Sequence, residues 1–488
     1  MLDFEKTNAA LFDFLDGSPV PFFAVRNMKE ALRSAGFSEL REGDPWTLAP
    51  GGAYFVSRND SALIAFRIPQ EAYVGFQIMA THCDSPVFKI KTNAEILVEN
   101  KYVRLNVEKY GGMLCAPWMD RPLSVAGRVV VETEGGGPDG PASMIETRLV
   151  NIERDLLIIP SLAIHMNREA NEGFRWNAQT DLLPLFAQAG PPPGASAAPR
   201  DVELAAAPAD AGSAPKGRRL SAGRAGLAGD HESVPGRFLA LIAREAGVRP
   251  DQILDADLYL YSRMPAAYVG LDREFIASGR LDDLQCAFAS LQGILDAEPV
   301  RSVAVHCVFD NEEVGSGTRQ GAGSTFLRDV LGRINASMGR SEEDHLRALA
   351  SSFMVSADNA HSIHPNHPEK ADPTNRPCMN RGIVIKYSAN QKYTTDGISS
   401  ALFAEICRRA GVPCQHFANR SDILGGGTLG NISNSHVSMN TVDIGLAQLA
   451  MHSAYETAGV HDIPYMTEAL KTFFELPVDI REGKIRID

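Results

Sequence analysis

The spacing of apolar residues changes along the chain and divides it into regions of different kinds. Residues 3–15 and 28–36 carry apolar side chains at helical spacing, which predicts two amphipathic helices. Nearly continuous apolar runs, among them VAVHCVF at 303–309 and FMVS at 353–356, predict buried strands. From about residue 237 such runs alternate with helical patterns. This alternation predicts an α/β fold in which helices cover a sheet.

A β-rich pattern occupies residues 95–236. The stretches AEILVENKYVRLNVEKY and SVAGRVVVET favour strands and are separated by glycine-bearing turns. Candidate metal-binding residues, described below, fall on both sides of this region. A domain inserted into another domain explains that split. We therefore predict a discontinuous α/β domain at 1–94 and 237–488, with an inserted β-rich domain at 95–236.

A low-complexity segment lies within the inserted region, at about 188–233. It is dense in Ala, Pro and Gly and almost free of large apolar residues. Such a composition cannot bury enough apolar surface to offset the entropy cost of ordering. We predict a disordered surface loop, and we interpret its basic cluster KGRRLSAGR as part of a solvated linker.

The overall composition narrows the class of protein. A chain of 488 residues with 44% hydrophobic and 22% charged residues is typical of a soluble globular protein with two domains. The formal net charge of −13, without a basic stripe, argues against nucleic-acid binding. Seven scattered cysteines without a CxxC pair indicate a reducing compartment. The acidic N-terminus lacks a signal-peptide pattern and no long apolar run predicts a membrane span, so we expect a cytoplasmic location.

The most informative motif is VFDNEEVGSG at 308–317. Two adjacent carboxylates, Glu312 and Glu313, follow a predicted buried strand and precede a glycine-bearing turn. Neighbouring side chains diverge where a strand ends, so one glutamate can bind a metal ion while the other reaches a metal-bound water molecule. Adjacent glutamates are also common on solvated helices, and the pair by itself leaves both interpretations open.

Two further segments offer polar groups of the same kind. THCDSP places His82 and Asp84 on one face of an extended segment, where Asp84 could orient a metal-binding imidazole. A hydrogen-bonded surface pair is the alternative. GRLDDL places Asp282 and Asp283 at the start of an apolar helical pattern, where helix capping is the alternative to metal binding.

The second half of the chain adds histidines. SADNAHSIHP follows a predicted buried strand and contains Asp358, His361 and His364. QLAMHSAYE places His452 on a helix-like pattern, where a core histidine is the alternative to a ligand. Together the segments supply oxygen and nitrogen donors without a thiolate. That donor set suits paired divalent metal ions that catalyse hydrolysis.

The order of these motifs carries a resemblance that spans most of the chain. The matching segments are HCDSP, YGGMLCAPWMDRPLSVAGRV, IPSLAIHMNREANEGF, GRLDDL, DNEEVGSGTRQGAGS, SADNAHSIHPN, IKYSANQKY and LAMHS. The chain resembles the aspartyl aminopeptidase and vacuolar aminopeptidase I family of dizinc metallopeptidases. The resemblance implies a three-layer α/β zinc-exopeptidase domain with an inserted dimerisation domain. It also implies release of the N-terminal residue from short peptides.

The resemblance implies a role for each matching position. Two zinc ions per subunit, for which manganese or cobalt can substitute, would be held by His82, Asp282, Glu313, Asp358 and His452. Asp282 would bridge the two ions, Glu312 would be the general base, and Asp84 would orient His82. Substrate-binding positions would be His165, His361, Lys386 and Tyr393, with His165 reaching the active site of a neighbouring subunit. The assembly implied is a tetrahedral homododecamer built from dimers.

The chain departs from the family pattern at Cys83, where a threonine is usual, and at Asp283, where an asparagine is usual. We expect little effect from Cys83, whose side chain should point away from the metals. The glycine-rich LGGGTLGN at 424–431 lacks the Gly-Lys-Ser/Thr of a phosphate loop, so we interpret it as a loop near the active site.

Lys386 favours an acidic N-terminal residue, Asp or Glu, in the substrate. A preference for neutral apolar residues and an N-acyl amino-acid deacylase of the same fold remain open. A non-enzymatic protein that kept the fold is a further alternative, although such a protein would be expected to have lost a ligand or the base.

Overall fold

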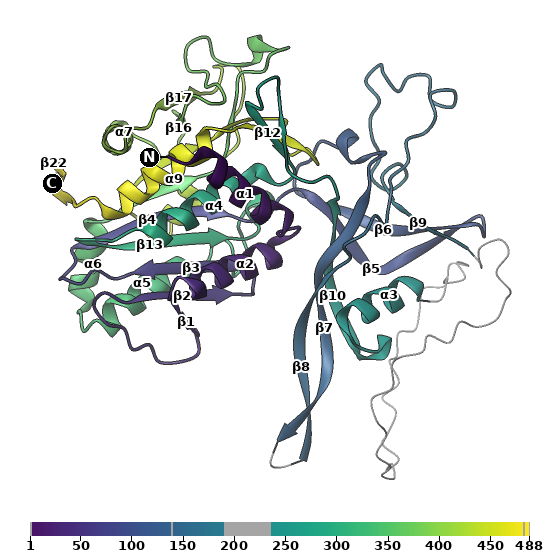
Figure 1. The fold of residues 1–488 in the computed structure, drawn as a ribbon, viewed down its shortest axis with the longest axis horizontal. Coiled ribbons are helices and arrows are strands. Elements are labelled where there is room, and N and C mark those ends of the chain that lie inside the picture. Colours follow the sequence, from purple (N-terminus) through teal and green to yellow (C-terminus); the bar gives the residue numbers. More distant parts are fainter. Residues whose placement is uncertain (1, 138–139, 190–235, 482–483, 488) are drawn as a thin grey trace.

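The computed structural model describes residues 2–137, 140–189, 236–481 and 484–487 (Figure 1). Within these ranges the largest sheet has nine strands, in the order β1 (Ser38–Leu40), β2 (Ala53–Arg58), β3 (Ala62–Arg67), β13 (Ser302–Phe309), β4 (Gly75–His82), β14 (Phe353–Ala357), β18 (Asn440–Gly445), β16 (Ile383–Tyr387) and β17 (Cys414–Ala418). The central strands β13, β4, β14 and β18 run parallel. Strand β4 and strand β13 are buried along their whole length. These strands confirm the apolar runs as buried strands.

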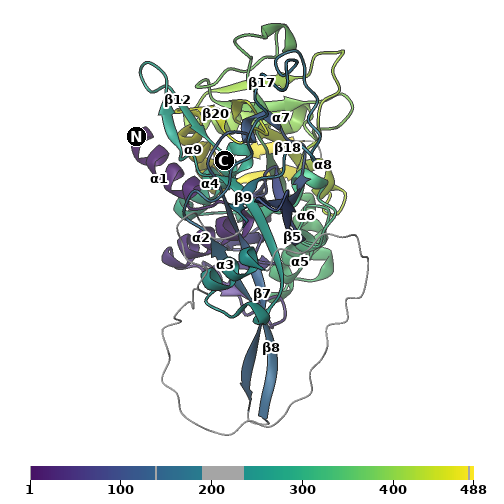
Figure 2. The same ribbon diagram turned by 90° about the vertical axis from the view of Figure 1, so that its right-hand side faces the viewer.

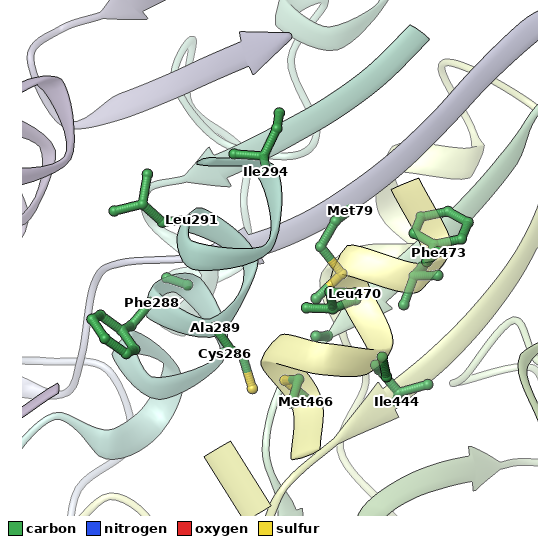
Figure 3. Packing of buried hydrophobic residues seen from close by; sticks show 14 of the residues in the cluster. Met79, Cys286, Phe288, Ala289, Leu291, Ile294, Ile444, Met466, Leu470 and Phe473 are labelled. Carbon is green, nitrogen blue, oxygen red and sulfur yellow. The ribbon is translucent and has the colours of Figure 1, made fainter. Parts of the chain in front are cut away.

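Helices cover both faces of this sheet and make three layers, as the α/β pattern predicts. One face carries α1 (Phe4–Asp16), α2 (Pro21–Ser34), α4 (Leu281–Asp296), α7 (Gly397–Ala410) and α9 (Asp462–Glu475). The other face carries α5 (Phe326–Ser337), α6 (Glu342–Ala350) and α8 (Leu429–Asn434). Successive strand side chains point to opposite faces. Met79 therefore packs against Leu470 of α9 (Figure 3), in the same core as Ile294 of α4, whereas Ile78 belongs to the core with α5 on the other side.

A second sheet stands beside the first (Figures 1 and 2). Its six strands in the described residues follow the order β8 (Gly140–Asn151), β7 (Leu123–Gly137), β10 (Ile253–Ser262), β5 (Val87–Val98), β6 (Tyr102–Tyr110) and β9 (Leu185–Gln188). Helix α3 (Arg237–Ala246) packs on it through Phe238 and Ile242. The predicted limits of the inserted domain, 95–236, do not match this sheet, which begins at Val87 and ends at Ser262. Only residues 83–86 separate β4 from its first strand, β5, so the sequence shows no break there.

The predicted loop at 188–233 lies outside the described residues from position 190 onwards. Its first residue, Gln188, ends strand β9 and pairs with Tyr102, and the amide of Ala189 donates to the carbonyl of Lys101.

Smaller sheets complete the described part of the chain. Five strands follow the order β11 (Ala267–Val269), β12 (Phe275–Ser278), β20 (Glu456–Gly459), β19 (Ala447–Leu449) and β15 (Ala360–His361). A two-stranded sheet joins β21 (Val478–Arg481) and β22 (Lys484–Ile487). The predicted helical pattern around His452 was wrong. Residues Ala447–Leu449 form the short strand β19. His452 lies in the connection from β19 to β20, with φ +66°.

The N-terminal helices test the other spacing predictions. The helix predicted at 3–15 is confirmed as α1. The helix predicted at 28–36 begins earlier, at Pro21, and ends at Ser34. Proline suits the first turn of a helix because that turn has no acceptor for its N–H. The pattern detected only the second half of α2.

Candidate metal centre

Three parallel strands end at one edge of the central sheet and bring the predicted ligands together. Strand β4 ends at His82, strand β14 ends one residue before Asp358, and strand β13 ends shortly before Glu312 and Glu313. The two glutamates occupy a short 3-10 helix, Glu312–Val314. Carboxyl ends of parallel strands meet at the same edge of a sheet, where ligand sites in α/β proteins form.

The remaining two ligands reach this edge from other elements. Asp282 lies at the start of α4, where its φ of −84° and ψ of 109° are not helical. The peptide bond between Asp282 and Asp283 is cis. His452 comes from the connection between β19 and β20. Both residues therefore lie in irregular backbone, which the sequence pattern did not predict.

The distances define two groups of donor atoms that share Asp282. His82 Nε2 lies 3.8 Å from Asp282 Oδ1 and 4.0 Å from Asp358 Oδ1. On the other side, His452 Nε2 lies 3.5 Å from Asp282 Oδ2 and 3.3 Å from Glu313 Oε2. In each group the donor atoms lie within 4.8 Å of one another. Glu312 forms a third close group with His82 and Glu313.

Asp84 supports both sides of this cluster. Its Oδ1 lies 3.4 Å from His82 Nδ1, and its carbonyl oxygen lies 3.1 Å from the same nitrogen. Its carboxylate also accepts the backbone N–H groups of Glu312 and Glu313, at 3.0 and 3.1 Å. The Tyr110 hydroxyl donates to it at 2.7 Å. Asp84 thus orients the His82 ring and fixes the turn that carries the two glutamates.

Lys386 holds Asp358. The Lys386 side chain is buried, and its ammonium donates to the carbonyl oxygen of Asp358 at 2.7 Å. It also lies 5.0 Å from the centre of the Tyr393 ring. Burial alone would lower the pKa of Lys386, but the Asp358 carboxylate, together with Tyr393, Asp443 and Asp283, raises that pKa above its ordinary value. The ammonium is therefore charged and already engaged by a candidate metal ligand.

The cluster concentrates acidic groups in a buried space. Burial is the main cause that raises the pKa of Glu312 to about 7, with Asp358 adding to it and His82 opposing it. Burial likewise raises the pKa of Asp358 to about 6, against the effect of Lys386. The pKa of Glu313 is raised well above its ordinary value by burial and by Asp282. These carboxyl groups cannot all be ionised together unless cations balance them.

The donor set fits zinc. Imidazole nitrogens and carboxylate oxygens are common zinc ligands. Glu313 Oε1 is buried and has no hydrogen-bond partner among the described residues. A buried, unpartnered carboxylate oxygen beside two other donors is what a metal ligand shows when no ion is present.

A cavity of about 460 Å³ adjoins the cluster. His361, from β15, lines it together with Gln448 and Met451, and Met451 directly precedes His452. Gly425 and Gly426 of the predicted active-site loop line it as well. Burial and Lys386 lower the pKa of His361, which favours its neutral form.

His165 is the one predicted site residue that does not join the others within this chain. It lies in an exposed turn between β8 and β9 of the second sheet. Neither donor group contains it.

Comparison with known proteins gives the family. The family model "Aminopeptidase I zinc metalloprotease (M18)" matches residues 14–474. The chain belongs to this family. A probable M18 family aminopeptidase 2 from Clostridium acetobutylicum is 43% identical over 477 residues, which cover 97% of this chain and 99% of that protein.

Two solved structures are similar to this metallo-aminopeptidase. The Ape4 and Nbr1 complex gives a TM-score of 0.84 at 34% identity, covering 96% of this chain and 86% of that chain. The S. cerevisiae mApe1 dodecamer gives a TM-score of 0.76 at 26% identity, covering 96% of this chain and 95% of that chain. The predicted family, α/β fold and metallo-aminopeptidase class are confirmed.

Several residues of the aminopeptidase site escaped sequence reasoning. Tyr110, Asn359 and Glu456 each contact a candidate ligand or its neighbour. Asn359 directly follows Asp358, and Glu456 follows His452 at four residues, yet neither spacing has a chemical signature of its own.

Among the described residues of the enzyme, no helix is long and apolar enough to cross a membrane.

Proposed function

We propose that this aminopeptidase binds two zinc ions per subunit and releases the N-terminal residue of short peptides with Glu312 as general base. The observation that carries the proposal is the pair of donor groups sharing Asp282, with Glu312 beside them. His82, Asp282 and Asp358 would hold one ion. Asp282, Glu313 and His452 would hold the other. When bound, the ions would polarise the scissile carbonyl and acidify the attacking water molecule.

The protein groups around the ions supply proton transfer and orientation. Glu312, with its pKa raised to about 7, can accept a proton near neutral pH and return it to the leaving amine. Asp84 keeps Glu312 in place through its backbone N–H. His361 lines the adjoining cavity, where it can donate a hydrogen bond to the developing oxyanion.

We further propose a preference for Asp or Glu at the peptide N-terminus. The cavity beside His361 is lined by two basic side chains, Lys370 and Arg376, and by the acidic side chain of Asp372. Arg420 also lines it but forms an ion pair with Asp422 at 2.7 Å. Lys370 and Arg376 are both exposed and can meet an acidic side chain, whereas Lys386 is occupied by Asp358. Tyr393, packed against Lys386, would shape the same region.

We propose that the enzyme assembles as a tetrahedral homododecamer built from dimers through the inserted domain. The turn that carries His165 exposes Leu162, Ile164 and Met166, at 54%, 44% and 74% of their surface. Such a run of exposed apolar side chains is typical of a surface that another subunit covers. His165 would then complete a neighbour's site.

All seven cysteines lie in the described ranges as free thiols, which supports a cytoplasmic location.

The function is tested with a panel of dipeptides that start with Asp, Glu, Leu or Ala, each with a free and an acetylated amine. We expect cleavage of free-amine substrates, fastest with Asp or Glu, and little cleavage of acetylated ones. Chelation should abolish the activity, and zinc, manganese or cobalt should restore it. Faster hydrolysis of the acetylated series would favour the deacylase. Full activity in metal-free protein would overturn the metal mechanism.

A further inference from the structure

Glu456 is a buried carboxylate that lies directly behind the candidate metal centre without belonging to either donor group. It begins strand β20 and is 2% exposed. Its Oε2 accepts the backbone N–H of Asp282 at 3.1 Å, and its Oε1 accepts the backbone N–H of His452 at 2.8 Å. One side chain therefore binds the backbone of two candidate ligands that are remote in sequence.

Both of those backbone positions need such a partner. His452 has φ +66°, a left-handed conformation that costs free energy for a residue with a side chain. Asp282 lies at the start of α4 in a conformation that is not helical. Neither N–H belongs to a regular ladder, and a buried N–H without an acceptor is costly. The Glu456 carboxylate supplies both acceptors.

A chain of buried amides extends from Glu456 to the other donor group. Gln448 Nε2 lies 3.5 Å from Glu456 Oε1, and Gln285 Nε2 lies 3.4 Å from Gln448 Oε1. Gln285 Nε2 also donates to Asn359 Oδ1 at 2.6 Å. Asn359, next to Asp358, donates to the carbonyl of Leu281 at 2.9 Å. The chain thus ties the backbone before Asp282 to the backbone after Asp358.

We propose that Glu456 is a positioning residue that sets the distance between Asp282 and His452, so that the zinc site these two share with Glu313 is formed before zinc binds. The inference rests on the proposed two-zinc function. A carboxylate suits the task because it offers two acceptors and no donor. Glutamine has the same shape but one acceptor, and its NH₂ group would face one of the two backbone N–H groups.

The experiment compares Glu456→Gln with a matched control, Asp462→Asn. Asp462 is also buried, and its carboxylate accepts the backbone N–H groups of Asn380 and Gly382 at 2.6 and 2.8 Å. It lies in neither donor group. Both variants therefore lose one acceptor of a buried pair, but only one of the pairs adjoins the metal centre.

Zinc affinity is measured by competition with a chromophoric chelator, and melting is followed in zinc-free protein. We expect both variants to melt at a lower temperature than the unchanged chain. Glu456→Gln should also weaken zinc binding by about 10–100-fold at the site formed by Asp282, Glu313 and His452, as loss of groups that orient ligands commonly does. Asp462→Asn should bind zinc as the unchanged chain does.

Equal zinc affinity in Glu456→Gln and the unchanged chain would overturn the inference while leaving the proposed function intact. An unchanged chain that binds no zinc would instead overturn the proposed function. If Glu456→Gln does not fold, amide hydrogen exchange of residues 447–459 in the zinc-free unchanged chain decides. Slow exchange that zinc hardly alters supports the inference, and protection that arises only with zinc contradicts it.

Discussion

Lys386 Nζ lies 3.6 Å from Asp358 Oδ2, within an ion pair whose lysine is 2% exposed in its side chain and whose aspartate is 15% exposed. We propose from this pairing that the lysine holds a candidate metal ligand, Asp358, in place. An ammonium that is bound to a carboxylate cannot also bind an acidic substrate side chain with full strength.

Substitution of Lys386 by Met tests that role. We expect the zinc-free variant to melt at a lower temperature, because breaking a buried ion pair leaves a charge without its partner. The ratio of kcat/KM for Asp-peptides to that for Leu-peptides should change less than about twofold. Arg376→Met, by contrast, should lower that ratio about tenfold, the effect of one lost charge-assisted hydrogen bond. A collapse of the ratio in Lys386→Met alone would return the specificity role to the lysine.

Substitutions should distinguish the roles of the two adjacent glutamates. Glu312→Gln should keep the zinc content and lose turnover by about 10²–10⁴-fold, the usual contribution of a general base. Glu313→Gln should instead reduce the zinc content, because its Oε2 lies 3.3 Å from His452 Nε2 within a donor group. Metal analysis and kinetics on the same preparations check both. The reverse pattern would exchange the two roles.

The acidity of the cluster predicts how zinc-free protein responds to pH. Glu312 has its pKa raised to about 7 and Asp358 to about 6, both above their values in an unfolded chain. Between about pH 4 and 7 the folded state therefore holds more protons than the unfolded state, and the free energy of unfolding falls as the pH rises. Zinc displaces those protons, so the melting shift on adding zinc should be larger at pH 7.5 than at pH 5. A shift that is larger at pH 5 would contradict the prediction.

The segment between β9 and α3 can be shortened without disturbing its ends. The Arg237 guanidinium donates to the carbonyl of Gln188 at 2.7 Å, so the two ends of the segment touch. Replacing residues 190–235 by a short Gly-Ser linker should leave zinc content and dipeptide turnover nearly unchanged, since loop closure depends weakly on length. Mass analysis, zinc analysis and kinetics test this. A large loss with the dipeptide would give the segment a structural role, and a loss confined to longer peptides would indicate control of substrate entry.

The sequence predicted that several candidate site residues lie together because they follow strands whose ends meet. His82, Asp358 and the glutamate pair each follow a fully apolar run, and such runs become parallel strands whose ends meet. His452 was placed on the wrong element because a short strand followed by a left-handed turn has no strong period. Glu456 was missed because it contacts backbone N–H groups that only the folded chain brings to it. The contact of Lys386 with Asp358 was likewise hidden, since a lone lysine in a strand carries no sign of its partner.

The order in which the donors occur has a consequence for biosynthesis. His82 is translated early, the second sheet follows, and His452 is translated after every other donor of the cluster. A ribosome must therefore complete almost all of the described chain before both donor groups can exist. Binding of both ions would therefore be a late event in the synthesis of the chain.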